Sequence, residues 1–131
     1  MLKIYNTLSK KIEDFVPIDK SHIKIYVCGP TVYDKIHIGN ARPLVVFDTF
    51  VRLLRYKYPK VTYVRNITDV DDKIINRAKE EGLPALDFSN KYIKEMHNDF
   101  FSLGIDSPDV EPKVSDHIEA VSYTHLTLPT T

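Results

Sequence analysis

The chain has 131 residues, of which 43% are hydrophobic and 27% charged, a composition typical of a folded globular domain and not of a disordered segment. Eighteen basic residues balance eighteen acidic ones, so the net charge predicts no general attraction to nucleic acid. A single cysteine excludes an intrachain disulfide framework and a cysteine-only zinc cluster. Because no run approaches about 18 apolar residues and no secretory leader is visible, we expect a cytoplasmic protein without a membrane span.

The first predicted elements form a strand–helix–strand unit. Residues 22–28 (HIKIYVC) alternate with period two and predict a strand that Gly29–Pro30 ends. A helix is predicted to open at Gly39–Asn40, with Asn40 as its N-cap and Pro43 in its first turn. Residues 61–67 (VTYVRNI) predict a second strand, which should run parallel to the first with a right-handed crossover. The fold class is therefore α/β.

Apolar side chains at helical spacing predict that the crossover helix is largely buried. They are Leu44, Val46, Phe47, Phe50, Val51, Leu53 and Leu54.

Two further helices are predicted downstream. Residues 73–81 form the first, closed by Gly82, and Pro84 starts the second, which Gly104 follows. A stripe along the second helix is expected to pack in the core, together with Phe101: Leu86, Ile93, Met96, Phe100 and Leu103. Residues 106–112 are expected to be a connector, and Ser115 to cap a short helix.

The end of the chain shows neither the alternation of a strand nor the apolar spacing of a helix. Residues 121–131 (VSYTHLTLPTT) hold four threonines within eight residues, which disfavours continuation of the short helix. A parallel sheet of two strands is also small for an α/β domain, since such sheets are covered on both faces. We therefore expect residues 1–120 to be an incomplete domain, residues 121–131 to be a non-native or disordered tail, and the chain to be a truncation.

Polar clusters follow both predicted strands, at the sheet edge where open α/β folds bind ligands. Residues 28–31 (CGPT) and 37–40 (HIGN) follow the first strand. A helix N-terminus there suits a phosphate, Gly39 permits close approach, and His37 and Asn40 can donate hydrogen bonds to developing charge. The alternative is that Asn40 is only a cap and His37 only a loop residue.

The remaining candidates carry two interpretations each. Cys28 is either a buried small hydrophobe, which we favour on its own evidence, or a ligand in a zinc site that needs at least three protein ligands. Asp69, Asp71 and Asp72 either hold Mg²⁺ or a substrate amine, or cap a helix, which we favour. Residues 52–63 are basic and aromatic, and a solvated face is favoured there over nucleic-acid binding.

Three sequence blocks carry a family resemblance. They are YVCGPTVYDKIHIGNAR (residues 26–42), VVFDTFVRLL (residues 45–54) and YVRNITDVDDKIINRA (residues 63–78). In this order they resemble the amino-terminal part of the class I cysteinyl-tRNA synthetases, over about residues 4–119. Residues 112–118 (PKVSDHI) resemble the family's Pro-Arg-Ala-Thr-x-His-Ile with three substitutions, and residues from 121 onward do not resemble it.

The resemblance implies the first half of a Rossmann-like class I catalytic domain that activates cysteine with ATP and transfers it to tRNA(Cys). It implies that His37 and Asn40 are catalytic and stabilise the α-phosphate, with Thr31 and Gly39 also binding ATP. It further implies that Gly29, Thr68 and Asp69 bind the substrate cysteine.

Cys28, on the same resemblance, is one ligand of a zinc ion that binds the substrate thiolate, a bond that serine cannot reproduce. The family's other zinc ligands and its KMSKS-type loop are not found in this chain. We therefore expect an inactive piece of a monomeric, cytoplasmic ligase.

Three alternatives stay open. A ligase that joins cysteine to an amino sugar would share the zinc ligand and the HxG motif. A small nucleotidyltransferase would fit a chain this short, but its HxGH signature ends in histidine where position 40 is asparagine. A non-enzymatic module could retain nucleotide or partner contacts alone.

Overall fold

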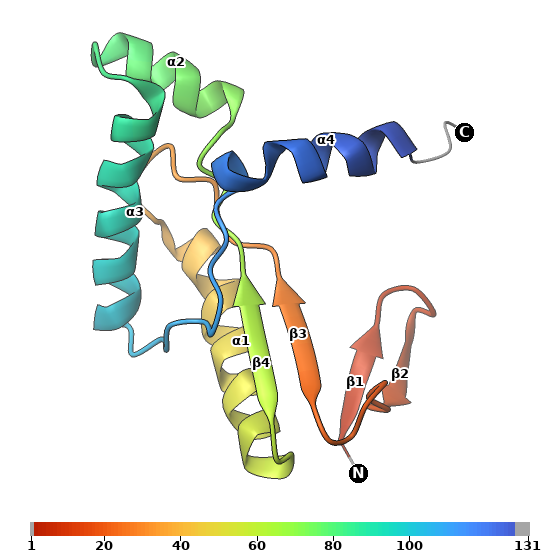
Figure 1. Ribbon diagram of the computed structural model, residues 1–131. Coiled ribbons are helices and arrows are strands. Elements are labelled where there is room, and N and C mark those ends of the chain that lie inside the picture. The colour runs from red at the N-terminus through yellow and green to blue at the C-terminus, as the bar shows by residue number, and fades with distance from the viewer. Residues whose placement is uncertain (1, 128–131) are drawn as a thin grey trace.

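The computed structural model describes residues 2–127, with side chains up to residue 123. Its elements are a hairpin, a parallel strand pair and several helices (Figure 1). In chain order they are β1 (Lys3–Asn6), β2 (Lys11–Asp14), β3 (Ile23–Val27), α1 (Ile38–Lys57), β4 (Val61–Arg65), α2 (Asp72–Glu80), α3 (Ala85–Ser102), the 3₁₀ helix η1 (Val114–His117) and α4 (Ile118–Thr127).

The predicted strand–helix–strand unit is confirmed. β3 and β4 are parallel neighbours, in register from Ile23–Val61 to Val27–Arg65. Helix α1 connects them and runs along one face of the pair (Figure 1). Both strands are shorter than predicted, because the residues after Val27 and Arg65 leave the regular ladder.

A third segment extends this sheet along the free side of β4. The Arg65 amide donates to the Val110 carbonyl at 3.1 Å, and the Ile67 amide donates to the Pro112 carbonyl at 2.9 Å. The sequence analysis treated residues 106–112 only as a connector. They lie beside β4 as a parallel, strand-like segment, so the sheet is wider than predicted.

Helices α1 and α3 bury one face each, which corrects two expectations. In α1, Leu44, Val51 and Leu54 are buried, but Val46 is 58% exposed. In α3, Phe100 is buried and Phe101 is 84% exposed. The other buried α3 positions are Phe88, Ser89, Tyr92, Ile93 and Met96, whereas Leu86 and Leu103 are exposed. Two predictions were therefore wrong: α1 is not largely buried, and the core does not include Leu86, Phe101 and Leu103. The reason is that, within residues 2–127, each helix has one covered side and one exposed side.

Helix ends agree with the predictions in part. Gly82 and Gly104 have φ values of +67° and +71° after α2 and α3, the left-handed conformation expected of a residue that follows a helix. Asp71 caps α2 by accepting from the Lys73 amide at 2.8 Å. The predicted cap of α1 was wrong, because His37 and not Asn40 is the N-cap residue.

The carboxyl-terminal end also differs from expectation. Ser115 does not cap a helix, since η1 begins after Lys113 without a side-chain cap. The predicted lack of a continuing helix was wrong, because α4 extends to Thr127. The last part of the expected tail, residues 128–131, lies outside the described residues.

The hairpin of β1 and β2 was not predicted. Its strands pair antiparallel from Lys3–Asp14 to Asn6–Lys11, and Lys10 has φ of +58° in the turn. Figure 1 shows the hairpin beyond β3, on the side away from β4. Phe15, just after β2, meets the rings of Phe50 and Tyr58 edge-on at 6.0 and 6.2 Å, which ties the hairpin to α1.

Within residues 2–127, no helix combines the length and the apolar character needed to cross a membrane.

Candidate functional site

The loops that follow β3 and β4 are joined at the carboxyl edge of the sheet. Thr31 and Thr68 form a parallel bridge, the Val32 amide donates to the Thr68 carbonyl at 3.1 Å, and the Thr68 amide donates to the Pro30 carbonyl at 3.3 Å. Three of the predicted site residues, Gly29, Thr31 and Thr68, therefore lie on two loops that are hydrogen-bonded to each other. This is the position where open α/β sheets bind ligands.

Gly29 occupies a place that no side chain could share. A Cβ atom there would lie 1.8 Å from the Asn66 carbonyl oxygen, far inside contact distance. The Gly29 amide donates to Asn66 Oδ1 at 2.7 Å. The loop after β3 is thus pressed directly onto the backbone after β4, and glycine is required there because of the close approach.

Cys28 presents an exposed thiol beside this contact. The thiol makes a weak contact with the backbone, since Sγ lies 3.7 Å from the Gly29 carbonyl oxygen. The favoured interpretation as a buried small hydrophobe was wrong, because Cys28 follows the buried Val27 and lies on the exposed side of the strand, with Lys24 and Tyr26. Among the described residues, no three histidine, cysteine, aspartate or glutamate side chains gather to hold a metal ion.

His37 caps α1 through its own imidazole. Nδ1 accepts from the Gly39 amide at 3.0 Å, and the His37 carbonyl accepts from the Asn40 and Ala41 amides at 2.9 and 3.1 Å. A neutral imidazole that accepts at Nδ1 carries its proton on Nε2. The cap therefore leaves Nε2–H as the outward donor of this exposed side chain.

Gly39 makes the cap possible by lacking a side chain. A Cβ atom at this position would lie 2.8 Å from His37 Cε1 and 2.9 Å from Nδ1. An alanine would push the imidazole aside and break its bond to the helix amide. The glycine in HIGN thus serves the histidine as well as any ligand that approaches the helix.

A hollow of about 700 Å³ adjoins this turn, between the first half of α1 and the end of α3. Its lining is mostly apolar, with Val45, Val46 and Leu103 exposed beside His37 and Arg42. Cys28 is not one of its lining residues. The roles that the family resemblance gives to Cys28 and His37 imply that both face one cleft, and this stays a prediction.

The loop between β3 and α1 is held by α2. Asp34 pairs with Arg77 at 3.0 Å and accepts from the Lys35 amide at 2.7 Å. These two hydrogen bonds, the backbone one first, hold the pKa of Asp34 below its usual range. The Lys73 ammonium lies 5.1 Å from the centre of the Tyr33 ring. The loop that leads into the HIGN turn is therefore held to α2 by an ion pair and a cation–ring contact.

The three acids after β4 have separate tasks. Asp71 caps α2, as the favoured interpretation predicts, and Asp72 is exposed in the first turn of that helix. Asp69 is only 2% exposed, and its two carboxylate oxygens accept from the Ser115 amide at 2.9 Å and the Ser115 hydroxyl at 2.5 Å. The structure thus uses the Asp69 carboxylate to tie residues 114–117 to the loop after β4.

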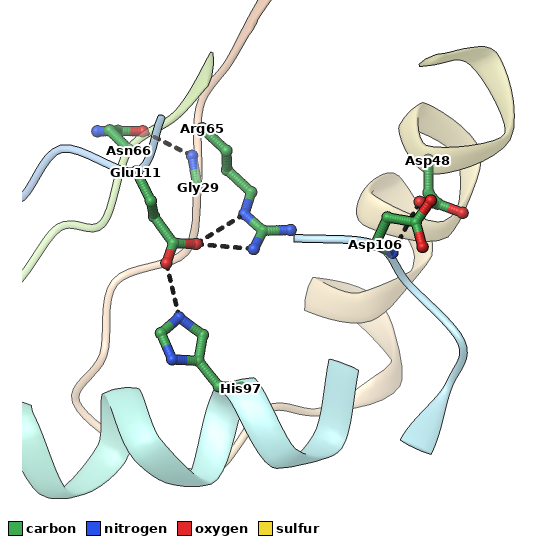
Figure 2. A network of polar contacts seen from close by, with 7 residues as sticks. All are labelled: Gly29, Asp48, Arg65, Asn66, His97, Asp106 and Glu111. Carbon is green, nitrogen blue, oxygen red and sulfur yellow. Dashed lines mark hydrogen bonds and ion pairs between the residues drawn. The ribbon is translucent and has the colours of Figure 1, made fainter. Parts of the chain in front are cut away.

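Sequence reasoning missed two consecutive residues, Arg65 and Asn66, that organise this edge (Figure 2). Arg65 is 2% exposed and donates to Glu111 Oε1 from Nε at 3.2 Å and from Nη2 at 2.7 Å. Glu111 Oε2 lies 2.7 Å from His97 Nε2 on α3. Figure 2 shows Arg65 reaching to Glu111 while Asn66 bonds Gly29. A basic and an amide residue at the end of a strand carry no sequence signal for this role.

Comparison with known proteins identifies the family to which the chain belongs. The family model described as tRNA synthetases class I (C) catalytic domain matches residues 14–127, eight residues beyond the point near residue 119 where the sequence analysis ended its resemblance. A cysteine–tRNA ligase from Wolbachia pipientis subsp. Culex pipiens (strain wPip) is 56% identical over 121 residues, which cover 92% of this chain and 26% of the relative. The cysteine–tRNA ligase of Clostridioides difficile (strain 630) is 53% identical over 120 residues, with the same coverage of 92% and 26%.

A solved structure has the same fold. It is the LeuRS chain in the ternary complex of Agrobacterium radiobacter K84 LeuRS, tRNA and LeuAMS, with a TM-score of 0.60 and 20% identity over 78% of this chain and 13% of that chain. The chain spans about a quarter of the length of the curated relatives it matches. With a family model that matches most of its length, and with the expected parallel unit in place, the chain belongs to the class I (C) tRNA synthetase catalytic domain family.

Proposed function

We propose that this chain forms part of a cysteine–tRNA ligase, which activates cysteine with ATP and transfers it to tRNA(Cys). In the first step the cysteine carboxylate attacks the α-phosphorus of ATP, and pyrophosphate leaves as cysteinyl-adenylate forms. In the second, a terminal ribose hydroxyl of the tRNA attacks the acyl carbon and AMP leaves. The observation that carries the proposal is identity of 51–56% to cysteine–tRNA ligases over 89–92% of the chain, including both loops of the site.

His37 and Asn40 are the proposed catalytic residues. The bond from the Gly39 amide to Nδ1 orients the imidazole of His37 and reserves Nε2–H as a donor. This donor, with the Asn40 side-chain amide, can stabilise charge that grows on the α-phosphate oxygens. Thr31 and Gly39 complete the proposed ATP contacts, and Gly39 lies in the first turn of α1, at the positive end of the helix.

The cysteine pocket is proposed at the joined loops. Gly29 and Thr68 lie on the hydrogen-bonded edge, and Asp69 follows in sequence with its carboxylate on Ser115. In this arrangement Asp69 contributes to the pocket by holding the loop after β4 in place.

Cys28 is the proposed zinc ligand of this chain. Its exposed thiol suits a single Zn–S bond, and zinc would supply a soft Lewis acid that selects a thiolate over a hydroxyl. A zinc site needs at least three protein ligands, and the side chains described, up to residue 123, hold no such group. The residues described here therefore do not by themselves make up a zinc site, and the roles proposed for His37, Asn40 and the cysteine pocket involve no metal.

A chimera tests the proposal. Residues 2–121 of this chain replace the matching segment of the Clostridioides difficile relative, and cysteine-dependent ATP–pyrophosphate exchange is measured. We expect exchange, and a loss of about 10²- to 10³-fold in kcat for His37→Ala, the cost of removing one charge-stabilising donor. The matched control is His22→Ala, because His22 bonds Thr62 at the opposite end of the sheet.

A chimera that unfolds cooperatively but gives no cysteine-dependent exchange would contradict the proposed function. The purified 131-residue chain is expected to give no exchange on its own, and exchange by it would overturn that part of the proposal. The same proposal places the protein in the cytoplasm, where tRNA charging serves protein synthesis. The monomeric state expected from the sequence stays a prediction.

A further inference from the structure

The backbone after β3 contains one extra residue relative to the backbone after β4. Val27 pairs with Arg65 in the ladder and Thr31 bridges Thr68, so three residues on the β3 side face two on the β4 side. This mismatch is the signature of a β-bulge, a feature that bends its strand and redirects a side chain. The three residues of the bulged side are Cys28, Gly29 and Pro30.

The bulge leaves a backbone amide to be satisfied outside the ladder. Pro30 has no N–H, and the bulged Gly29 amide donates to the side chain of Asn66 at 2.7 Å. The Asn66 carbonyl meanwhile occupies the place where a Gly29 side chain would stand. Backbone amides are strong donors that are costly to leave unpaired when buried, so Asn66 stabilises this particular path of the chain.

Asn66 is itself held from both sides. Arg65 before it is clamped by Glu111, and its Cγ lies 3.3 Å from the position of a Gly29 Cβ. Ile67 after it is 2% exposed, and its backbone bonds Pro112 and Val114. The amide oxygen that binds Gly29 therefore extends from a well-anchored segment.

We infer that Asn66 is a positioning residue for Cys28: its side-chain oxygen holds the Gly29 amide, keeps the bulge in one conformation and so aims the Cys28 thiol. The inference deepens the proposed function and rests on it for its importance, since a ligand to zinc or to substrate must be presented in one direction. The contact itself can be tested on the thiol and the amide without any ligase assay.

The test is NMR on the 131-residue chain with Asn66→Ala, Asn66→Asp and the control Asn98→Ala. Asn98 is an exposed asparagine on α3. The first readout is hydrogen exchange of the Gly29 amide, whose intrinsic rate is unchanged because residue 66 is not its sequence neighbour. The second is the pair of Hα–Hβ couplings of Cys28, the chain's single cysteine, which report its χ1 torsion.

We expect Asn66→Ala to speed Gly29 exchange about tenfold, the effect of losing one hydrogen bond, and to average the Cys28 couplings. The amides of β4 should keep their protection, which separates a local effect from general unfolding. Asn66→Asp retains an acceptor and should restore both readouts, and Asn98→Ala should leave both at parent values.

Unchanged Gly29 exchange and Cys28 couplings in Asn66→Ala would overturn the inference. If Asn66→Ala gives no dispersed spectrum, Asn66→Asp decides, because loss of Gly29 protection in a folded variant that keeps the acceptor also overturns it. Absence of pyrophosphate exchange in the chimera would count against the ligase proposal and leave these readouts unaffected, so the two failures can be told apart.

Discussion

Removal of the Glu111 carboxylate should destabilise the chain far more than loss of an ordinary ion pair. Glu111 accepts two hydrogen bonds from Arg65, at 3.2 and 2.7 Å, and Arg65 is 2% exposed. Its remaining terminal nitrogen, Nη1, is buried without a hydrogen-bond partner. In Glu111→Ala the guanidinium would therefore lose its carboxylate while it stays enclosed.

The expected cost follows from the burial. Breaking a buried ion pair by removing one partner costs about 3–5 kcal/mol, because a charge is left without compensation. The Arg65 guanidinium also lies 5.1 Å from the centre of the Phe100 ring, a contact that the substitution leaves intact and that is worth up to about 2 kcal/mol when desolvated. We therefore expect the lower end of the range, about 3 kcal/mol.

Urea unfolding of the 131-residue chain, followed by circular dichroism, measures this cost. The matched control is Glu81→Ala, since Glu81 pairs with Lys91 at 3.3 Å with side chains 34% and 49% exposed and such a surface pair is worth about 0–1 kcal/mol. The double variant Arg65→Met/Glu111→Leu should recover most of the loss, because it removes both charges. A cost for Glu111→Ala below about 1 kcal/mol, equal to the control, would refute the reasoning.

Three further predictions concern single contacts. Gly29→Ala should cost about 3 kcal/mol in urea unfolding, because its Cβ would overlap the Asn66 carbonyl oxygen at 1.8 Å, and a cost below about 0.5 kcal/mol would show that the loop can move away. Asp71→Ala should cost about 1 kcal/mol through loss of the cap on the Lys73 amide, and an unchanged unfolding midpoint would contradict it. The pKa of Asp109 lies below the ordinary 3.8, chiefly because the Tyr63 amide donates to its carboxylate. The contribution of this carboxylate to the free energy of unfolding is therefore present above about pH 4 and is lost as pH falls through the lowered pKa. In Asp109→Asn the unfolding free energy should fall less steeply below about pH 4 than in the parent, and parallel curves would contradict this.

The strand–helix–strand unit could be predicted because its signals are local. Period-two alternation in residues 22–28 and helical spacing in α1 depend only on neighbouring residues, and β3, α1 and β4 formed as expected. The glycines after α2 and α3 were predictable for the same reason, since a left-handed residue after a helix has a short-range cause.

Contacts between distant segments could not be predicted in this way. Arg65 reads as the polar end of a strand, yet it is buried because Glu111, 46 residues later, returns to meet it. Ser115 reads as a helix cap, yet it bonds Asp69 at the same separation of 46 residues. The hairpin of β1 and β2 was missed because its strands are four residues each, without a buried face to impose a pattern.

The orientation of Cys28 shows why a site is harder to predict than a strand. Alternation along residues 22–28 places its side chain opposite the buried Ile23 and Val27, on the side of the exposed Lys24 and Tyr26, and the thiol is indeed exposed. Alternation gives only the side of the strand and not the conformation of the backbone around Cys28. The ladder ends at the pair Val27–Arg65, and the extra residue before Thr31 redirects the chain. That mismatch is a property of two segments 37 residues apart and is stabilised by Asn66. The backbone next to the thiol is therefore held from the partner segment, by an asparagine that no motif distinguishes.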